Sequence, residues 1–225
     1  MRYLLSLIIL SSIVSCKKET ISVPAEIPVP YSEASYTMIV SLNWQGPQFT
    51  VPPTAHVTTL IGLIHSRDTV LWGPDKLATK GLEDVAETGN ATNMNLELDA
   101  IITTRKALSK FMLSPPSIRG SISAVLNFST AYSYVSFASM IAPSPDWFLG
   151  IHDVNLFSNK RWVDDVTINI MLYDAGTEDG DVFGYNNPET IPQQNVSFLT
   201  PSKATVLSNG NTAFSAIGTV RFMKN

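Results

Sequence analysis

Two acidic side chains stand where they could bind a cation together. Asp146 lies in the segment Pro-Ser-Pro-Asp-Trp-Phe, and Asp174 begins the segment Asp-Ala-Gly-Thr. Each follows a strand-like run and occupies a turn that proline stiffens or glycine opens. Carboxylates on neighbouring loops are oxygen ligands of the kind that calcium prefers. The pair therefore predicts either a cation site or an adhesive tip at one end of a β-framework.

Other interpretations of these carboxylates stay open. Asp146 and Asp174 could each cap a turn by accepting backbone N–H groups, and the acidic residues at 178–181 could form a solvated loop. A carboxylate pair can also cleave glycosides, but the general acid then needs a raised pKa, whereas a cation between the two would lower both pKa values.

Catalysis by known motifs is not expected. The chain contains no Gly-x-Ser-x-Gly elbow, no His-Glu-x-x-His pair and no glycine-rich phosphate loop. The spacing of His56 and His65 matches no zinc motif, so structural roles are expected for them. We expect a protein that is not an enzyme.

The first residues indicate export. An apolar run at 3–14 follows Arg2 and is too short to anchor in a bilayer, so residues 1–15 are expected to be a signal peptide. The run ends in Ile-Val-Ser-Cys, which fits a bacterial lipobox. Cys16 is the single cysteine and is expected to carry lipid. Because Lys17 rather than Asp follows it, an outer-membrane lipoprotein of a bacterial envelope is expected, held on the membrane by its acyl chains.

Residues 16–31 contain Pro24, Pro28 and Pro30 and are expected to be a lipidated tether, followed by one domain at 32–225. A hydrophobic content of 44% is sufficient for a core that has no disulfides. The formal net charge of −4 argues against nucleic acid as a partner, since nucleic-acid binding needs clustered Lys and Arg.

Alternating apolar and polar residues predict a mainly β, antiparallel β-sandwich with a helical insertion at about 81–112. Within the insertion, helices are expected at 82–86 and 94–112, the first stopped by Gly89 and the second by Pro115 and Pro116. Strands are expected at 35–44, 120–127, 132–142, 148–157, 165–173, 196–199 and 213–223.

Several motifs, in order, resemble those of the spondin N-terminal domain family. They include Leu-Ile-Gly at 60–62, Ala-Glu-Thr-Gly at 86–89, Pro-Ser-Pro-Asp-Trp-Phe at 143–148, Asp-Ala-Gly-Thr at 174–177 and Pro-Glu-Thr-Ile-Pro at 188–192. The resemblance spans about 36–222. It implies a β-sandwich similar to calcium-dependent lipid-binding modules, in a family whose animal members act in the extracellular matrix and in adhesion.

The resemblance also implies a calcium ion near one end of the sandwich. Asp146 and Asp174 match two of its ligands, and a third position, which is Glu in the family, falls on Asn127. An amide oxygen brings no charge, so the implied site is weaker than one with three carboxylates.

The expected function is an envelope-anchored binding or adhesion module. Calcium would stiffen the tip, and a protein or glycan would meet the ordered surface. The alternatives are a calcium-dependent module that contacts lipid, and a carboxylate-pair hydrolase.

Overall fold

The computed structural model of the chain describes residues 30–115 and 117–225, so the expected signal peptide, Cys16 and nearly all of the tether lie outside the described residues. In chain order the described elements are β1 (Glu33–Asn43), β2 (His56–Val57), β3 (Leu60–His65), α1 (Lys80–Thr88), α2 (Thr92–Thr103), β4 (Ala107–Leu113), β5 (Arg119–Ser129), β6 (Tyr134–Ala142), β7 (Trp147–Asn155), β8 (Phe157–Ser158), β9 (Arg161–Trp162), β10 (Asp165–Asp174), β11 (Ser197–Phe198) and β12 (Gly218–Lys224).

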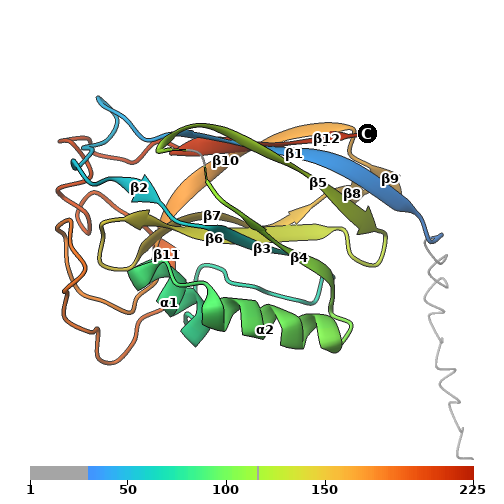
Figure 1. Ribbon diagram of the computed structural model, residues 1–225, viewed down its shortest axis with the longest axis horizontal. Coiled ribbons are helices and arrows are strands. Elements are labelled where there is room, and N and C mark those ends of the chain that lie inside the picture. Colours follow the sequence, from blue (N-terminus) through green and yellow to red (C-terminus); the bar gives the residue numbers. More distant parts are fainter. Residues whose placement is uncertain (1–29, 116) are drawn as a thin grey trace, which may run out of the picture.

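The main strands form one continuous antiparallel path in the order β4-β3-β6-β7-β10-β12-β1-β5. Figure 1 shows the path folded into two facing layers, with β12, β1 and β5 above and β7, β6, β3 and β4 below. Strand β10 joins the layers, because its first part pairs with β12 and its last four residues pair with β7. The predicted mainly β sandwich is confirmed.

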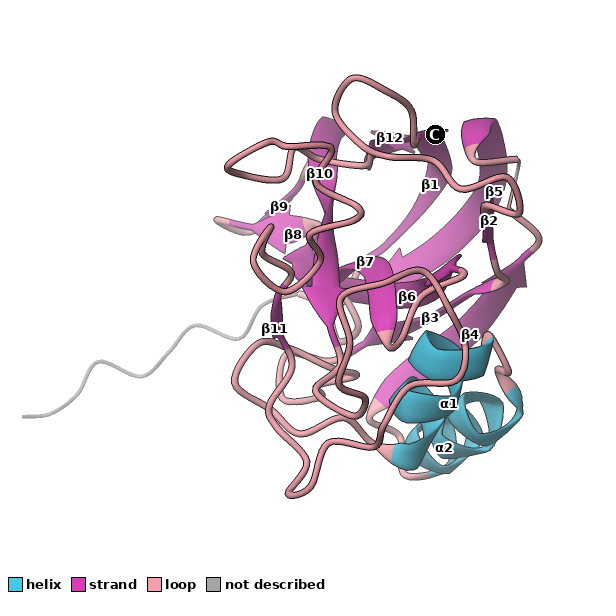
Figure 2. Cartoon of the chain, turned by 90° about the vertical axis from the view of Figure 1, so that its left-hand side faces the viewer, coloured by secondary structure: helices cyan, strands magenta, loops and turns pink. Residues whose placement is uncertain are grey.

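Two hydrophobic clusters hold these layers together. Strand β1 buries Tyr36, Met38, Val40 and Leu42 at alternate positions, as a strand with one core-facing side must. These residues belong to the cluster between the two sheets. A second cluster fills the space between the lower sheet and the helices, which cover its outer face (Figure 2). Strand β6 is therefore buried on both faces.

The predicted helical insertion is confirmed, with local signals that explain its limits. The Thr79 hydroxyl caps α1 by accepting a hydrogen bond from the Leu82 N–H at 3.2 Å. Gly89 ends the helix in a left-handed conformation with φ of 70°. A Cβ on Gly89 would also lie only 2.4 Å from Thr58 Cγ2, so a larger residue does not fit there. None of the described helices is long and apolar enough to cross a membrane.

The second helix ends earlier than the sequence predicts. It stops at Thr103, and residues expected to continue it to Met112 form β4 instead. The spacing of Leu108 and Met112 fits a helical face, yet both side chains are substantially exposed. Arg105, with φ of 58°, breaks the helix, and β4 then pairs along the otherwise open edge of β3. Tertiary pairing overrides the local periodicity here.

Strand β3 itself was not among the expected strands, although every residue in it is buried. Gly62 stands within it and weakens the strand signal, because glycine has a low β-propensity. The packing explains why glycine occurs there. A Cβ at this position would lie 2.3 Å from Phe111 Cζ, so Gly62 makes room for the aromatic ring of the neighbouring strand β4.

Candidate functional site

The two predicted aspartates meet where β7 begins and β10 ends. Asp174 pairs with Trp147 across these strands, and the Ala175 N–H donates a hydrogen bond to the Asp146 carbonyl at 3.1 Å. Asp146 is completely buried and Asp174 is 7% exposed. The expectation that both residues stand at one end of the sheet agrees with the structure.

Asp146 uses one carboxylate oxygen to hold the loop that follows β10. Its Oδ2 accepts hydrogen bonds from the Thr177 N–H at 2.8 Å, the Thr177 hydroxyl at 3.3 Å and the Glu178 N–H at 3.2 Å. Its Oδ1 is buried and has no hydrogen-bond partner among the described residues. A buried acceptor without a partner is costly, so this oxygen is a candidate ligand atom.

Asp174 shapes its own turn and faces a cationic side chain. Its Oδ1 accepts the Gly176 N–H at 3.0 Å, and its Oδ2 lies 3.3 Å from Lys203 Nζ. Gly176 has φ of 75°, and a Cβ on it would come within 2.4 Å of the Gln194 carbonyl oxygen, so no larger residue fits this turn. The turn-capping interpretation of both aspartates is thus supported by their contacts.

Negative charge gathers around Asp146. Burial, and then the charge of Asp174, raise the pKa of Asp146 to about 6 despite its hydrogen bonds. Burial raises the pKa of Glu178 to about 7, with added repulsion from Glu87 and Asp146. The pKa of Glu87 is raised as well, chiefly by burial. Glu178 was expected in a solvated loop, but the structure half-buries it beside Asp146.

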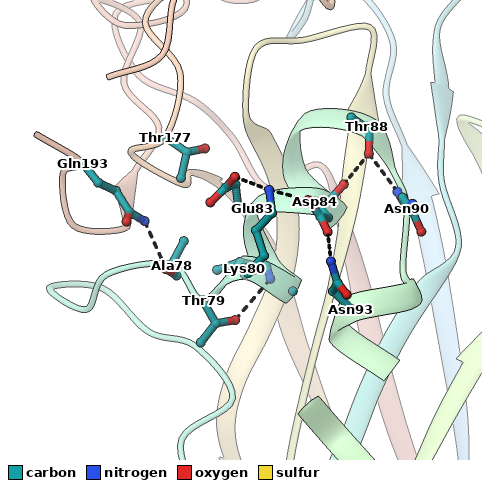
Figure 3. Close-up of polar contacts among 12 residues, drawn as sticks. Ala78, Thr79, Lys80, Glu83, Asp84, Thr88, Asn90, Asn93, Thr177 and Gln193 are labelled. Carbon is teal, nitrogen blue, oxygen red and sulfur yellow. Dashed lines mark hydrogen bonds and ion pairs between the residues drawn. The ribbon is translucent and has the colours of Figure 1, made fainter. Parts of the chain in front are cut away.

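Helix α1 supplies the opposite wall of this acidic region. A hollow of about 330 Å³ is lined by Glu83 and Glu87 of the helix and by Thr177 and Glu178 of the loop. Figure 3 shows Thr177 beside α1, where Lys80 pairs with Glu83 and Asp84. The Gln193 amide nitrogen donates to the Ala78 carbonyl at 3.0 Å and joins the loops to the helix entrance. Sequence reasoning missed this role of α1, because the helix is remote from both aspartates in the chain.

Asn127 does not belong to this region. It pairs with Ser35 near the beginning of β1. The beginning of β1 pairs with the end of β12, and the end of β12 pairs with the beginning of β10 at Asp165, so Asn127 lies at the same end of the sheet as Asp165. Asp174 lies at the other end of β10, about 30 Å away at about 3.3 Å per strand residue. The expectation that Asn127 shares a site with Asp146 and Asp174 is therefore corrected by strand register.

The carboxylates of Asp146 and Asp174 suit a cation that is held by few charged side chains. Among the described residues, no group of three or more His, Cys, Asp or Glu side chains is gathered closely enough to hold a metal ion. The favourable observation is the buried, unpartnered Oδ1 of Asp146 beside the carboxylate of Asp174. Two carboxylates fit calcium if carbonyl oxygens or waters complete its shell.

The histidines considered for zinc lie apart. His56 is exposed and pairs with Ala142 at one end of β6, whereas His65 is buried and pairs with Tyr134 at the other end. The ring nitrogens of His65 lie 2.9 Å from the Ser66 carbonyl oxygen and 2.9 Å from Ser136 Oγ. His65 is therefore a hydrogen-bonded core residue.

Comparison with known proteins agrees with the motifs. The family model Spondin_N matches residues 34–214. Spondin-2 of Homo sapiens is 36% identical over 152 residues, covering 67% of this chain and 46% of that protein. Spondin-1 of Gallus gallus is 30% identical over 176 residues, covering 74% of this chain and 22% of that protein. The chain thus spans less than half the length of these relatives. On the extent of the family match, it belongs to the spondin N-terminal domain family.

Proposed function

We propose that the chain is an extracellular binding or adhesion module whose working surface is the loop end around Asp146 and Asp174. Membership of the spondin N-terminal family supports a binding role. The motif at the N-terminus supports placement on a bacterial outer membrane through lipidated Cys16. The partner is proposed to be a protein or a glycan.

Calcium is proposed as the ion that stiffens this end. The observation that carries the proposal is the Oδ1 atom of Asp146, which is buried without a partner among the described residues, next to a second carboxylate. Asp146 and Asp174 would hold the ion. The negative charge of Glu178, which interacts with Asp146, would stabilise the bound ion further. A bound cation would offset the repulsion among these groups. It would also restrict the loop at 174–178 before a partner arrives, which reduces the entropy cost of binding.

A binding role fits the site better than hydrolysis. The raised pKa of Asp146 is a property that a general acid needs. However, Asp146 is completely buried, and Trp147 beside it is also fully buried. A catalytic acid must lie within hydrogen-bond reach of its substrate. The burial of Trp147 likewise favours a core role over stacking on a sugar.

Calorimetric titration of the full chain with calcium tests the proposal. We expect saturable heat for the unmodified chain and none for Asp146→Asn, which keeps the side-chain shape but removes the charge. Asp68→Asn, on an exposed carboxylate, is the control and should bind as the unmodified chain does. Equal heats for both variants, or no heat at all, would refute the cation site.

Two further measurements address the partner. A glycan array and a capture assay with envelope proteins, each run with calcium and with chelator, should show calcium-dependent binding that Asp146→Asn loses. Calcium-dependent pelleting with anionic liposomes would instead support the lipid-contacting alternative.

A further inference from the structure

A groove opens between the two strands that end the sheet path. It has a volume of about 860 Å³, and residues 108–111 of β4 and 124–129 of β5 form its long walls. These strands belong to different layers of the sandwich (Figure 1). Asn127 lines the groove, so the groove lies at the end of the sheet that is remote from Asp146 and Asp174. It is therefore a surface separate from the proposed cation site.

Core side chains are incompletely covered in this groove. Leu126 and Phe128 of β5 are buried in the cluster between the two sheets. Phe111 of β4 and Ala124 of β5 pack against the same cluster and line the groove, but both are only partly buried. The inner faces of both strands thus form an apolar floor. An apolar occupant that removed this floor from water would be stabilised by the hydrophobic effect.

Both walls also present unpaired backbone groups. Within the described residues, β4 pairs with β3 alone and β5 pairs with β1 alone, whereas every other strand of the main path pairs on both sides. Each wall therefore turns an edge of backbone N–H and C=O groups toward the groove. Sheet edges of this kind are templates for an additional strand.

The two walls are too far apart to pair with each other. Paired antiparallel strands place opposite Cα atoms about 4.5 to 5.5 Å apart. In nearly every residue pair formed by one residue of β4 and one of β5, the Cα atoms are more than 8 Å apart. A strand inserted between the walls needs two strand spacings, which is about 9.6 Å in total. Such a strand could pair with both walls at once.

The chemistry of the groove favours an extended peptide over other occupants. An acyl chain could cover the apolar floor, but it has no N–H or C=O group for either wall. A second copy of the chain could offer its own β4 or β5 edge. That strand is already paired on its other side, so it could pair with only one wall. A segment of a partner protein supplies hydrogen-bonding groups along both of its edges.

Charge complementarity specifies the inward side chains of this segment. Among the described residues that line the groove, Glu33 and Lys110 alone are charged. Lys110 Nζ lies 2.6 Å from Asp99 Oδ1, and Glu33 Oε1 accepts a hydrogen bond from the Tyr31 hydroxyl. The floor itself is uncharged, so a charged side chain placed over it would lose hydration without gaining a partner. Apolar side chains fit the floor, and polar ones fit the solvent side.

We propose that this groove binds an extended segment of a partner protein, which adds as a strand between β4 and β5. Apolar side chains at every second position of the segment cover the floor. Walls of four to six residues correspond to about 13 to 20 Å of strand, so the segment that contacts them has about six residues. Binding involves neither Asp146 nor Asp174 and therefore does not depend on calcium or on the proposed cation site.

Fluorescence anisotropy of a labelled peptide with the full chain, in chelator, tests the proposal. The probe is the peptide Lys-Thr-Val-Thr-Val-Thr-Val-Thr-Lys with blocked ends. Its matched control carries N-methyl groups on the threonines, so it lacks the N–H groups of one edge but keeps the valine side chains. We expect saturable binding of the probe. The control should bind at least about tenfold more weakly, because the hydrogen bonds to one wall are lost.

Variants of β5 locate the binding. Ala124→Phe fills the groove, and Ala124→Asp places a charge over its floor, so each should weaken probe binding at least about tenfold. Ser123→Phe and Ser123→Asp place the same side chains on the exposed outer face of β5 and should leave probe binding unchanged. Asp146→Asn should also bind the probe as the unmodified chain does. Urea denaturation of each variant establishes that the domain is folded.

Hydrogen exchange identifies the strands that the peptide contacts. At saturating probe, exchange of the edge amides of β4 and β5 should slow at least about tenfold. The amides of β6, which is paired on both sides, should exchange as they do without the probe and serve as the internal reference.

Several results would overturn the proposal. They are the absence of saturable binding up to about 1 mM probe, equal binding of the probe and the methylated control, and undiminished binding by both Ala124 variants. Protection of β4 and β5 that rises with protein concentration in the absence of the probe would assign the groove to a second copy. Equal protection by a single-chain detergent would assign it to an acyl chain.

Discussion

Asp146 and His65 are both completely buried, at opposite ends of the β6–β7 pair, yet their surroundings differ. His65 has a partner on each ring nitrogen. Because the Ser66 carbonyl only accepts, Nδ1 carries the proton and Nε2 accepts from the Ser136 hydroxyl. Asp146 leaves Oδ1 without a partner among the described residues and faces a second carboxylate. A buried polar group whose hydrogen-bonding atoms all have partners indicates a structural residue. A buried carboxylate with an unpartnered oxygen beside a second carboxylate indicates a residue that can bind a ligand.

The two groups also give opposite pH dependences. Burial lowers the pKa of His65 below its usual 6.5, so the unfolded chain takes up a proton first and stability is lost as pH falls below 6.5. The pKa of Asp146 is raised from 3.8 to about 6, so its contribution is fully favourable below 3.8 and is lost as pH rises through 6. At neutral pH, His65 is in its preferred neutral form, whereas the charge of Asp146 is disfavoured by its surroundings.

The largest expected effect is on the structural member of the pair. His65→Ala should lower the free energy of unfolding by about 3 to 5 kcal/mol, because it opens a cavity and leaves the Ser136 hydroxyl and Ser66 carbonyl without partners. Urea denaturation at pH 7 measures this. His56→Ala, at an exposed position, should change stability by less than about 0.5 kcal/mol. A small effect at His65 would show that its two hydrogen bonds do not make it a structural residue.

Asp146→Asn should act in the opposite direction. In chelator at pH 7, it should stabilise the domain by up to about 3 kcal/mol. The pKa of Asp146 is raised by about two units, and each unit corresponds to about 1.4 kcal/mol. The gain should shrink as pH falls from 6 to 4, where the native carboxyl is already protonated. Urea denaturation across this range measures it, with Asp68→Asn as the control. Destabilisation at every pH would show that the hydrogen bonds to the loop outweigh the repulsion.

Lys203 offers the smallest and most selective test. Its ammonium lies 3.3 Å from Asp174 Oδ2, where it partly neutralises the site. Lys203→Met should cost less than about 1 kcal/mol of stability, because the side chain is 40% exposed. It should also tighten calcium binding severalfold in calorimetry, since a competing cation is removed. Lys224→Met, which breaks a pair with Asp164 at the other end of the sheet, should leave calcium affinity unchanged.

Sequence reasoning succeeded where a signal was local. Alternation predicted β1, because each core-facing residue of that strand is separated by one outward residue. Thr79 and Gly89 mark the two ends of α1 in the structure, and Gly89 was the expected stop. The turn chemistry around Asp146 and Asp174 predicted that both would stand at strand ends, and the structure places them there.

Sequence reasoning failed where neighbours in space, rather than in the chain, decide the structure or surroundings of a residue. Residues 107–113 carry a helical spacing, but β3 offers an edge that a strand can pair with. The prediction that Asn127 is a third ligand rests on its position in the order of motifs, but the pairing register of β5 with β1 places it at the far end of the sheet. Glu87 and Glu178 are acidic residues like many others until folding sets α1 against the loop after β10.

Residue types and spacings alone were enough to establish the family, the mainly β class, the helical insertion and the two aspartates as a pair. The mainly β class and the helical insertion depend on patterns that act over a few neighbours in the chain, whereas the family and the pair of aspartates depend on the order of several short motifs along it. Folding in three dimensions was needed to decide which oxygen of Asp146 stays unpartnered, which charges surround it, and that β4 and β5 end the sheet on either side of a groove. These properties arise from burial and from long-range strand register, which bring together residues far apart in the chain.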